Sequence, residues 1–423
     1  MERLDRLPRG SRDLLPPAAA ARRTLQTRLL DLFDAWGFSE VVPPLVEYDD
    51  VHRRSLAGDQ ENRVVRFIEA GTGDMVSLRA DVTPQIARMV AQRVRPEGRA
   101  VRVSYAADVL RIPDERREQA EVHQVGVELI GEGGAMVDAE MVSLADACLR
   151  RAGLTDFRIE LAHTGAFRAA LQTLGLPADE ATHLRGPFAR KDEVGVSAIL
   201  KSNGVGPRRR AAMFALCRAY GGPEVIDAAR ESLRPLKIDA SLDHLDAVVE
   251  ALDAYDPEVR SRLTIDIGEA RGFDYYTGVR LRAWAPGSSE PIIRGGRYDD
   301  MVARYGADLP AVGFAVDLDA LERAQEHGGR RRKGRRPRGC LVALKDPSNA
   351  ARRARAVSFA RDARGRGTPA WVCSRPLDLV DAKTLAYEHG ARELVHVGAR
   401  TTAWRLEKDV WQRQDNLGKQ RKK

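Results

Sequence analysis

The chain has 423 residues, 43% hydrophobic and 31% charged, which is enough for two or three domains that each bury a core. It contains no run of about 18 apolar residues, and its charged N-terminus lacks a signal-peptide core, so neither a membrane span nor secretion is predicted. The four cysteines are scattered and form no CxxC pair, which argues against disulfides or a metal site and predicts a cytoplasmic protein.

The formal net charge of +8 comes from two short segments. Residues 330–338, RRRKGRRPR, carry seven basic side chains, and residues 419–423 carry four. The remainder of the chain is therefore slightly acidic. Nucleic-acid contact is one interpretation of these segments, and a solvated linker and tail is the other. The second is favoured because no aromatic residues interleave with the charges, so a nucleic-acid partner is not predicted.

A helix is predicted over residues 18–36, where Leu25, Leu29 and Phe33 recur on one face after two prolines. A strand follows within residues 38–48 and stops at the double proline, which cannot continue a central ladder. The predicted elements after it are a hairpin over 64–79, a helix from Asp81, strands at 99–105 and 122–130, a helix at 136–152, a strand at 157–163 and a helix from 164.

Helical spacing dominates residues 180–258, which predicts an inserted helical segment. Strand patterns return at 263–267, 275–284 and 311–316, before a helix at 317–325. Beyond the basic run, strands at 339–344, 369–373 and 393–397 alternate with helices at 349–364 and 378–389, which predicts a small parallel βαβαβ module. No dinucleotide or P-loop motif occurs, and no cofactor is predicted.

Four segments place polar residues and glycines on apolar strands or at helix starts: LRADVT (78–83), HQVGVE (123–128), RGFDYYTG (271–278) and GGRYDD (295–300). Carboxylates suit an ammonium group, arginine suits a carboxylate, and glycine allows close approach to a ligand. Together they predict a pocket for a small zwitterion. Glu128, between Val127 and Leu129, must be paired or hydrogen-bonded if buried; a structural arginine partner is the alternative.

In this order the segments resemble the catalytic core of histidyl-tRNA synthetase, a class II aminoacyl-tRNA synthetase. The resemblance covers residues 8–325, from PRGSRDLLP through FSEVVPPLVE, LRADVTPQIARM, HQVGVELIG, RGFDYYTG and GGRYDDM to AVGFAVDLDAL. It implies an α+β fold with a six-stranded antiparallel sheet and flanking helices. The implied divisions are a core over 1–325 with a helical insertion at about 180–258, a basic linker at 326–338 and a reduced anticodon-binding-like α/β module at 339–423.

The resemblance implies a retained pocket for histidine. Asp81, Thr83 and Gln124 would hold the α-ammonium group of the amino acid. Glu128 and Tyr276 would contact the imidazole, with Tyr275 and Tyr298 beside them, and Arg271 would face the carboxylate. The helix after the first prolines and the strand with Pro43 and Pro44 would form a homodimer interface, for which an ordinary edge strand is the alternative.

The ATP side of the synthetase pattern departs from the family. Arg111 aligns with the motif-2 arginine only across a one-residue gap, and Pro113 then replaces a glutamate. Ala320 stands in place of the motif-3 arginine, and Asp317 would place negative charge where the triphosphate is held. Substitution by Arg323 is disfavoured, because it lies almost a helical turn away. No catalytic residue is therefore predicted.

A retained amino-acid pocket beside a dismantled nucleotide site resembles the regulatory subunits of ATP phosphoribosyltransferase, the first enzyme of histidine biosynthesis. That resemblance implies a non-catalytic subunit that assembles with a short-form catalytic subunit into a hetero-octamer and confers inhibition by histidine. A divergent histidyl-tRNA synthetase and a stand-alone histidine-sensing module are the alternatives. An effector site between the two subunit types, away from the pocket, also stays open.

Overall fold

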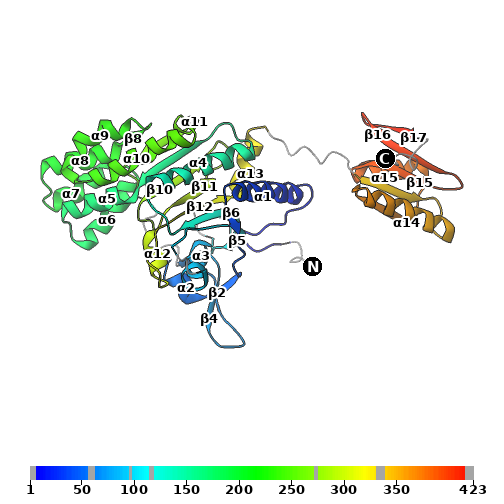
Figure 1. The fold of residues 1–423 in the computed structure, drawn as a ribbon, viewed down its shortest axis with the longest axis horizontal. Coiled ribbons are helices and arrows are strands. Elements are labelled where there is room, and N and C mark those ends of the chain that lie inside the picture. Colours follow the sequence, from blue (N-terminus) through cyan, green and yellow to red (C-terminus); the bar gives the residue numbers. More distant parts are fainter. Residues whose placement is uncertain are drawn as a thin grey trace. The chain divides into compact units, whose positions relative to one another are not determined.

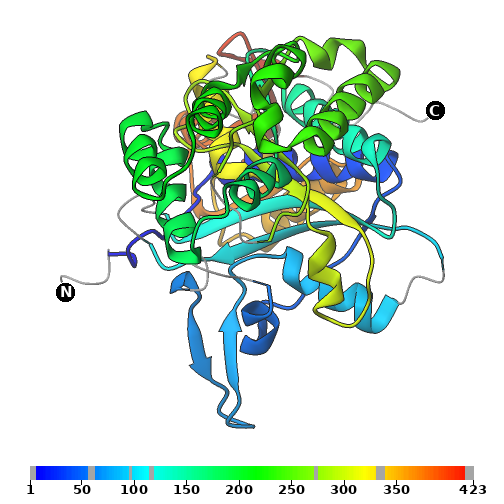
Figure 2. The same ribbon diagram turned by 90° about the vertical axis from the view of Figure 1, so that its left-hand side faces the viewer.

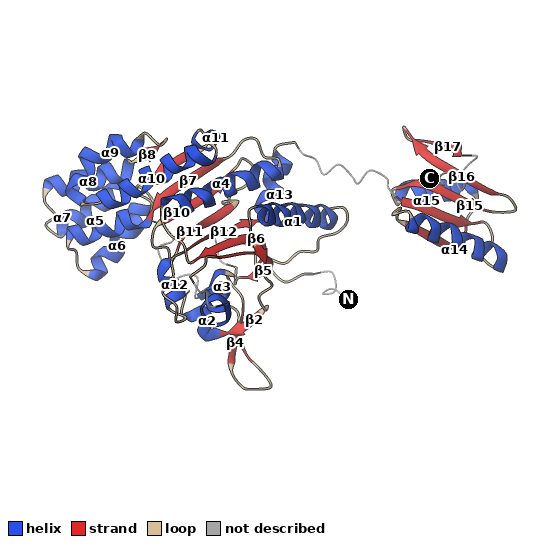
Figure 3. Cartoon of the chain, in the orientation of Figure 1, coloured by secondary structure: helices blue, strands red, loops and turns tan. Residues whose placement is uncertain are grey.

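The computed structural model describes residues 6–55, 62–94, 98–113, 119–270, 275–329 and 339–414. The chain divides into two compact units, Met1–Arg331 and Arg332–Lys423. Figures 1 and 2 show their elements from two directions, and Figure 3 distinguishes helices from strands. The basic segments at 330–338 and 419–423 lie outside the described residues, so the predicted linker stays a prediction. Within the described part, no helix is long and apolar enough to cross a membrane.

A nine-stranded sheet forms the centre of the first unit, in the order β1-β5-β6-β12-β11-β10-β7-β9-β8. The six consecutive strands from β5 to β7 pair antiparallel, which confirms the predicted class II-like sheet. The short strands β1, β9 and β8 extend its two edges. The strands are β1 (Ser39–Glu40), β5 (Val101–Leu110), β6 (Glu121–Ile130), β7 (Arg158–His163), β8 (Tyr220–Gly221), β9 (Leu263–Asp266), β10 (Val279–Trp284), β11 (Ile293–Arg297) and β12 (Ala311–Asp317).

The two faces of this sheet carry different kinds of side chain, because side chains alternate between the faces along each strand. On β6, Val125, Val127 and Leu129 join the main hydrophobic core with three helices on the same face (Figure 1). Gln124 and Glu128 point to the opposite face, where the site lies. The core-side helices are α1 (Ala18–Ala35), α4 (Ala135–Ala152) and α13 (Leu318–His327).

A smaller group of elements covers the opposite face, around the three-stranded sheet β2-β4-β3. The hairpin of β3 and β4 is antiparallel, as predicted. The elements of this smaller group are β2 (Val46–Tyr48), α2 (Asp49–Arg53), β3 (Arg66–Ile68), β4 (Met75–Leu78), α3 (Thr83–Met89), the π-helical turn η2 (Val90–Val94) and α12 (Asp299–Ala303).

The strand predicted to stop at the double proline is β1, which ends before Pro43 at the edge of the large sheet, and the residues after Pro44 form β2 in the small sheet. Pro43 and Pro44 separate the two because proline has no N–H to donate to a ladder. Their carbonyl groups are used instead: Arg79 Nη1 donates to Pro43 at 2.9 Å, and Gln85 Nε2 donates to Pro44 at 2.8 Å.

Between β7 and β9 the chain forms a helical insertion, seen at the upper left of Figure 1 in green. Its apolar residues belong to the same core cluster as the sheet, so the insertion is packed onto the sheet. Helix α10 contacts α4 directly. The elements are α5 (Thr164–Leu174), α6 (Ala178–Ala189), α7 (Glu193–Ser202), α8 (Pro207–Arg218), α9 (Val225–Leu233), the 3-10 turn η3 (Arg234–Leu236), α10 (Asp239–Tyr255) and α11 (Pro257–Arg260).

The second unit contains a five-stranded sheet in the order β14-β13-β15-β16-β17. The first three strands are parallel, as predicted, and separate cores form under its two helices. The two antiparallel strands at the other edge were not predicted. Their turn has Lys408 and Asp409 at φ of 46° and 62°, where a glycine or asparagine signal is usual. The elements are β13 (Gly339–Leu344), α14 (Ala350–Gly365), β14 (Ala370–Pro376), α15 (Leu379–Glu388), β15 (Ala391–Val397), β16 (Thr401–Glu407) and β17 (Val410–Gln414).

Candidate functional site

A cavity of about 110 Å³ opens on the face of the central sheet opposite the core helices. Carboxylate, amide, phenol and guanidinium groups line it together with glycine backbone. The lining residues are Asp81, Thr83, Arg111, Gln124, Glu128, Tyr275, Tyr276, Arg280, Arg294, Gly295, Tyr298, Gly313, Phe314 and Ala315. Residues from α3, four strands of the sheet and the segment before β10 therefore meet around one small space.

Glu128 lies at the bottom of this cavity and is 1% exposed. The hydroxyl of Thr83 donates to its Oε1 at 2.7 Å, and the hydroxyl of Tyr298 donates to its Oε2 at 2.5 Å. Burial raises the pKa of Glu128 to about 8; the two hydrogen bonds lower it, and the nearby charge of Asp81 raises it. Glu128 is thus a carboxyl group with hydrogen-bond partners and no arginine at either oxygen, which excludes the structural ion pair among the described residues.

Glycine is required on the neighbouring strands for this carboxyl group to fit. Gly313 pairs with Glu128 across the ladder, and a Cβ atom there would lie 1.7 Å from Glu128 Oε2. A Cβ atom at Gly126 would lie 2.5 Å from the hydroxyl oxygen of Tyr105, which packs beneath the same face. The glycines in the QVGVE and AVGFAV segments therefore create the space that the polar side chains occupy.

Three tyrosines form the aromatic wall of the cavity. The Tyr275 hydroxyl donates to that of Tyr276 at 3.1 Å, and their ring centroids are 4.4 Å apart. The Tyr275 and Tyr298 rings meet edge to face at 6.2 Å. Burial raises the pKa of all three phenols above the ordinary value, so they are neutral hydrogen-bonding groups at physiological pH.

The cavity has acceptors for a cation on one side and arginines on the other. Gln124 Oε1 is buried and accepts no hydrogen bond from any described residue. It lines the same space as the Asp81 carboxylate, and a buried acceptor of this kind is normally satisfied by a ligand or water. Arg280 and Arg294 supply guanidinium groups from β10 and β11. Such a site matches a small molecule that carries both an ammonium group and a carboxylate.

Seven of the eight residues predicted for the amino-acid pocket line this single cavity. They are Asp81, Thr83, Gln124, Glu128, Tyr275, Tyr276 and Tyr298. The eighth, Arg271, lies outside the described residues. Sequence reasoning missed Arg280 and Arg294. The signal for both was a charged residue within an otherwise apolar strand run, GVRLRAW and PIIRGG, where alternation places Arg280 and Arg294 on the face of Glu128.

The two aspartates of the segment aligned with motif 3 each have partners within the fold. Asp317 Oδ1 accepts a hydrogen bond from the amide of Ala320 at 2.9 Å and so caps α13. Asp319 forms ion pairs with Arg12 and Arg22, on the side of α1. Among the described residues, neither carboxylate lines the cavity, and Ala320 is fully buried in the core.

Ion pairs occupy the sheet surface beyond Tyr276. Arg282 is 6% exposed and pairs with both Glu160 and Glu269. Arg280 Nη1 lies 3.5 Å from Glu269 Oε1, and Arg294 pairs with Glu290. Glu160 and Glu269 thereby neutralise the Arg282 guanidinium group, which could otherwise face a phosphate group. In the described part of the chain, no group of three or more His, Cys, Asp or Glu residues is placed to hold a metal ion.

The sequence model of the histidyl-tRNA synthetase family matches residues 10–321. The ATP phosphoribosyltransferase regulatory subunit of Syntrophotalea carbinolica is 35% identical over 88% of this chain and 85% of its own length. The chain belongs to the ATP phosphoribosyltransferase regulatory subunit family. The protein of the same description from Moorella thermoacetica is 37% identical over 86% of this chain and 90% of its own length.

A crystal structure from Bacillus halodurans C, described as an ATP phosphoribosyltransferase regulatory subunit/histidyl-tRNA synthetase, has the same fold. It superimposes with a TM-score of 0.80 at 25% identity and covers 94% of this chain and 99% of its own. The present chain therefore shares the class II synthetase-like sheet, on which its cavity lies, with the Bacillus halodurans protein.

The raised pKa of Glu128 predicts a pH dependence of stability. The native protein keeps a proton on Glu128 up to about pH 8, whereas the unfolded chain loses it near 4.5. The stabilising contribution is thus complete below pH 4.5 and is lost as pH rises through 8. We expect the difference in free energy of unfolding between wild type and Glu128→Gln to fall by roughly 1.4 kcal/mol per pH unit between pH 4.5 and about pH 8. Urea unfolding of both proteins at several pH values measures this difference. A difference that is constant with pH would contradict a buried, protonated Glu128.

The contact between Gly313 and Glu128 predicts that Gly313→Ala is damaging. The added methyl group overlaps Glu128 Oε2 and lies 2.4 Å from the Val127 carbonyl oxygen, so the strands must separate. We expect the free energy of unfolding to fall by about 1–3 kcal/mol or more. Gly328→Ala is the matched control, because its Cβ would meet backbone only at 3.6 Å and its φ is −68°. Equal stability of the two variants would contradict the packing described here.

Proposed function

We propose that this chain is the non-catalytic regulatory subunit of an ATP phosphoribosyltransferase and acts in the first step of histidine biosynthesis. One contrast supports this function most strongly: the cavity keeps Glu128, Gln124 and the tyrosines, whereas Ala320 replaces the arginine of a nucleotide clamp. The phosphoribosyl transfer itself belongs to a short-form catalytic subunit, with which this chain forms a hetero-octamer. Family membership supports that partner.

Histidine is the effector that we assign to the cavity. The buried Gln124 Oε1 and the Asp81 carboxylate suit its ammonium group, and the neutral phenol of Tyr276 and the carboxyl group of Glu128 suit its imidazole nitrogens. Arginines on the far side suit its carboxylate. Inhibition requires that histidine bind the inhibited state of the complex more tightly than the active state.

Synthetase activity is absent in this proposal for two structural reasons. Ala320 can make no contact with phosphate, and Pro113 offers neither a donor nor the carboxylate of the synthetase pattern. In addition, Arg282, Glu160 and Glu269 form a buried ion-pair cluster beside the cavity, and ATP could use the arginine only if those pairs were broken.

Two assays on the purified chain test the regulatory function. Alone, it should show no histidine-dependent exchange of pyrophosphate into ATP. Mixed with a short-form catalytic subunit, it should form a complex by size-exclusion chromatography and raise the rate of phosphoribosyl transfer, which histidine then inhibits. Measurable pyrophosphate exchange would replace this function with that of a divergent synthetase. Histidine binding without a complex at micromolar concentration would indicate a stand-alone sensor.

Replacing Glu128 tests where histidine binds. Glu128→Ala removes the acceptor at the bottom of the cavity, so we expect the histidine concentration for half inhibition to rise by about tenfold or more. The complex should still assemble. Glu322→Ala is the control, because Glu322 is also buried but pairs with Arg22 on the other side of the sheet. Unchanged inhibition in Glu128→Ala would place the effector at an interface between subunits.

We also propose a homodimer through the segment around Pro43 and Pro44. Large apolar side chains are exposed on one face of the small sheet, where the register of β2, β4 and β3 brings them to the same side, and on the chain just before β2; exposed apolar patches are unusual on a monomer. On that face they are Val46, Tyr48 and Phe67, and before β2 they are Val42 and Leu45. A two-fold axis through this patch would let each copy cover that of the other.

Charge substitutions in the patch test the dimer. Val42, which is 85% exposed, and Tyr48, which is 54% exposed, are replaced in Val42→Asp/Tyr48→Glu. We expect light scattering to show half the mass of wild type, because buried unpaired carboxylates oppose association. Val194→Asp alters an equally exposed apolar residue on α7 and should leave the mass unchanged. A wild type that is already monomeric would refute the interface.

A further inference from the structure

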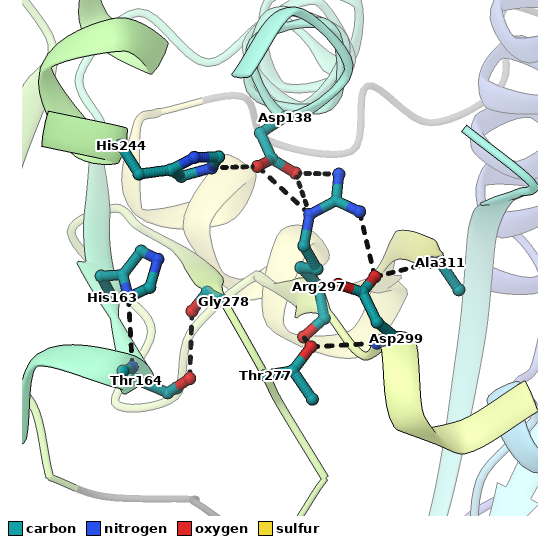
Figure 4. Close-up of polar contacts among 10 residues, drawn as sticks. Asp138, His163, Thr164, His244, Thr277, Gly278, Arg297, Asp299 and Ala311 are labelled. Carbon is teal, nitrogen blue, oxygen red and sulfur yellow. Dashed lines mark hydrogen bonds and ion pairs between the residues drawn. The ribbon is translucent and has the colours of Figure 1, made fainter. Parts of the chain in front are cut away.

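A second buried polar network lies behind the cavity, on the core side of the sheet (Figure 4). Arg297, the last residue of β11, is 5% exposed and pairs with Asp138 of α4, which is 1% exposed. Arg297 Nη2 lies 2.7 Å from Asp138 Oδ1, and Arg297 Nη1 lies 3.0 Å from Asp299 Oδ1. The guanidinium group thus joins the helix behind the sheet to the residue that begins α12.

The other oxygen of Asp138 is held by the helical insertion. His244 of α10 places Nε2 2.7 Å from Asp138 Oδ2, and the ring of His163 packs edge to face on His244 with centroids 5.5 Å apart (Figure 4). His163 Nδ1 accepts from the amide of Gly165 at 3.1 Å and so caps α5, where the insertion begins. Both the start of the insertion and its α10 helix therefore meet at Asp138.

This network reaches the cavity through the backbone of β11. Strand alternation points Arg297 to the core side and its neighbours Gly296 and Tyr298 to the cavity side. The amide of Thr277, which follows Tyr276, donates to the Arg297 carbonyl at 2.7 Å, and Thr277 Oγ1 accepts from the amide of Asp299 at 3.0 Å. Two cavity residues, Tyr276 and Tyr298, are consequently attached to the segment that Arg297 anchors.

We propose that Asp138, held by His244, is a positioning residue for the cavity: it fixes the end of β11 so that the Tyr298 hydroxyl reaches Glu128. Asp138 itself does not line the cavity. The insertion thereby sets the affinity of a site that it does not contact. The identity of the ligand rests on the proposed function, whereas the positioning of β11 does not.

Asp146 provides a matched control on the same helix. It lies roughly two turns from Asp138 and is 0% exposed. It also binds two cations, with Arg262 Nε and Arg150 Nε each 2.6 Å from a carboxylate oxygen. Neither arginine belongs to a strand that lines the cavity. Removing either aspartate charge breaks a comparable buried ion pair, so loss of stability alone would affect both variants alike.

The test compares Asp138→Asn, Asp146→Asn and His244→Gln in the full chain. Hydrogen exchange of ligand-free protein reports on the amides of Tyr298 and Asp299, and calorimetry reports the dissociation constant of L-histidine. Both aspartate variants should unfold at lower temperature. Of the two aspartate variants, only Asp138→Asn should accelerate exchange at residues 298–299 and raise the dissociation constant of L-histidine by about tenfold. The dissociation constant of Asp146→Asn should stay within about twofold of that of wild type. His244→Gln should change both readouts in the same direction by less.

Two results would overturn the positioning role. One is an Asp138→Asn variant with the same exchange at residues 298–299 and the same affinity for L-histidine as wild type. The other is an Asp146→Asn variant in which both quantities change as much as in Asp138→Asn. If Asp138→Asn does not fold, His244→Gln takes its place and is compared with Asp146→Asn by the same two measurements. If wild type itself binds no histidine, the proposed function fails, while the contrast in exchange at 298–299 still tests the anchoring of β11.

Discussion

A carboxyl group buried in the middle of a β-sheet is the constraint on which the rest of this structure depends. Glu128 cannot be placed there without cost, and two hydroxyl donors from distant parts of the chain reduce that cost. Thr83 must begin α3 at this point, Tyr298 must follow β11, and residue 313 must lack a Cβ atom. The cavity therefore depends on the strand order, because β12 lies between β6 and β11 and supplies Gly313 opposite Glu128.

The two faces of β11 explain how a ligand site and an inserted helical segment are joined. Arg297 faces Asp138 and His244 behind the sheet, while the next residue, Tyr298, faces Glu128 in front of it. Ionic groups lie on both faces of the sheet, but the contacts that they make have different consequences. Behind the sheet they hold a strand end in place, whereas beside the cavity Arg282 is neutralised by Glu160 and Glu269.

The sheet and most of the cavity residues could be predicted because the order of the motifs resembles that of histidyl-tRNA synthetase, and local signals agree with the resemblance at these positions. Glu128 within an apolar strand and glycines at alternate positions require no knowledge of distant partners. Other features depend on pairing that one sequence does not display. Asp138 and His244 are 106 residues apart, and nothing near either one marks it as polar core. The stop at Pro43 and Pro44 was predicted from a local signal, whereas the second sheet that follows depends on the pairing of β2 with β4, which the sequence does not display.

Helix α3 gives a physical reason why a synthetase-like pocket suits a subunit that acts through assembly. Its first residue, Thr83, holds Glu128 in the cavity, and one helical turn later Arg88 binds Glu47 while Gln85 binds the Pro44 carbonyl. Pro44 and Glu47 belong to the segment whose apolar side chains are exposed for association. A ligand that alters the Thr83–Glu128 contact acts on the helix that also supports this surface. If copies associate through this surface, a ligand that shifts α3 also changes their association, and by linkage association changes the affinity for that ligand by the same factor.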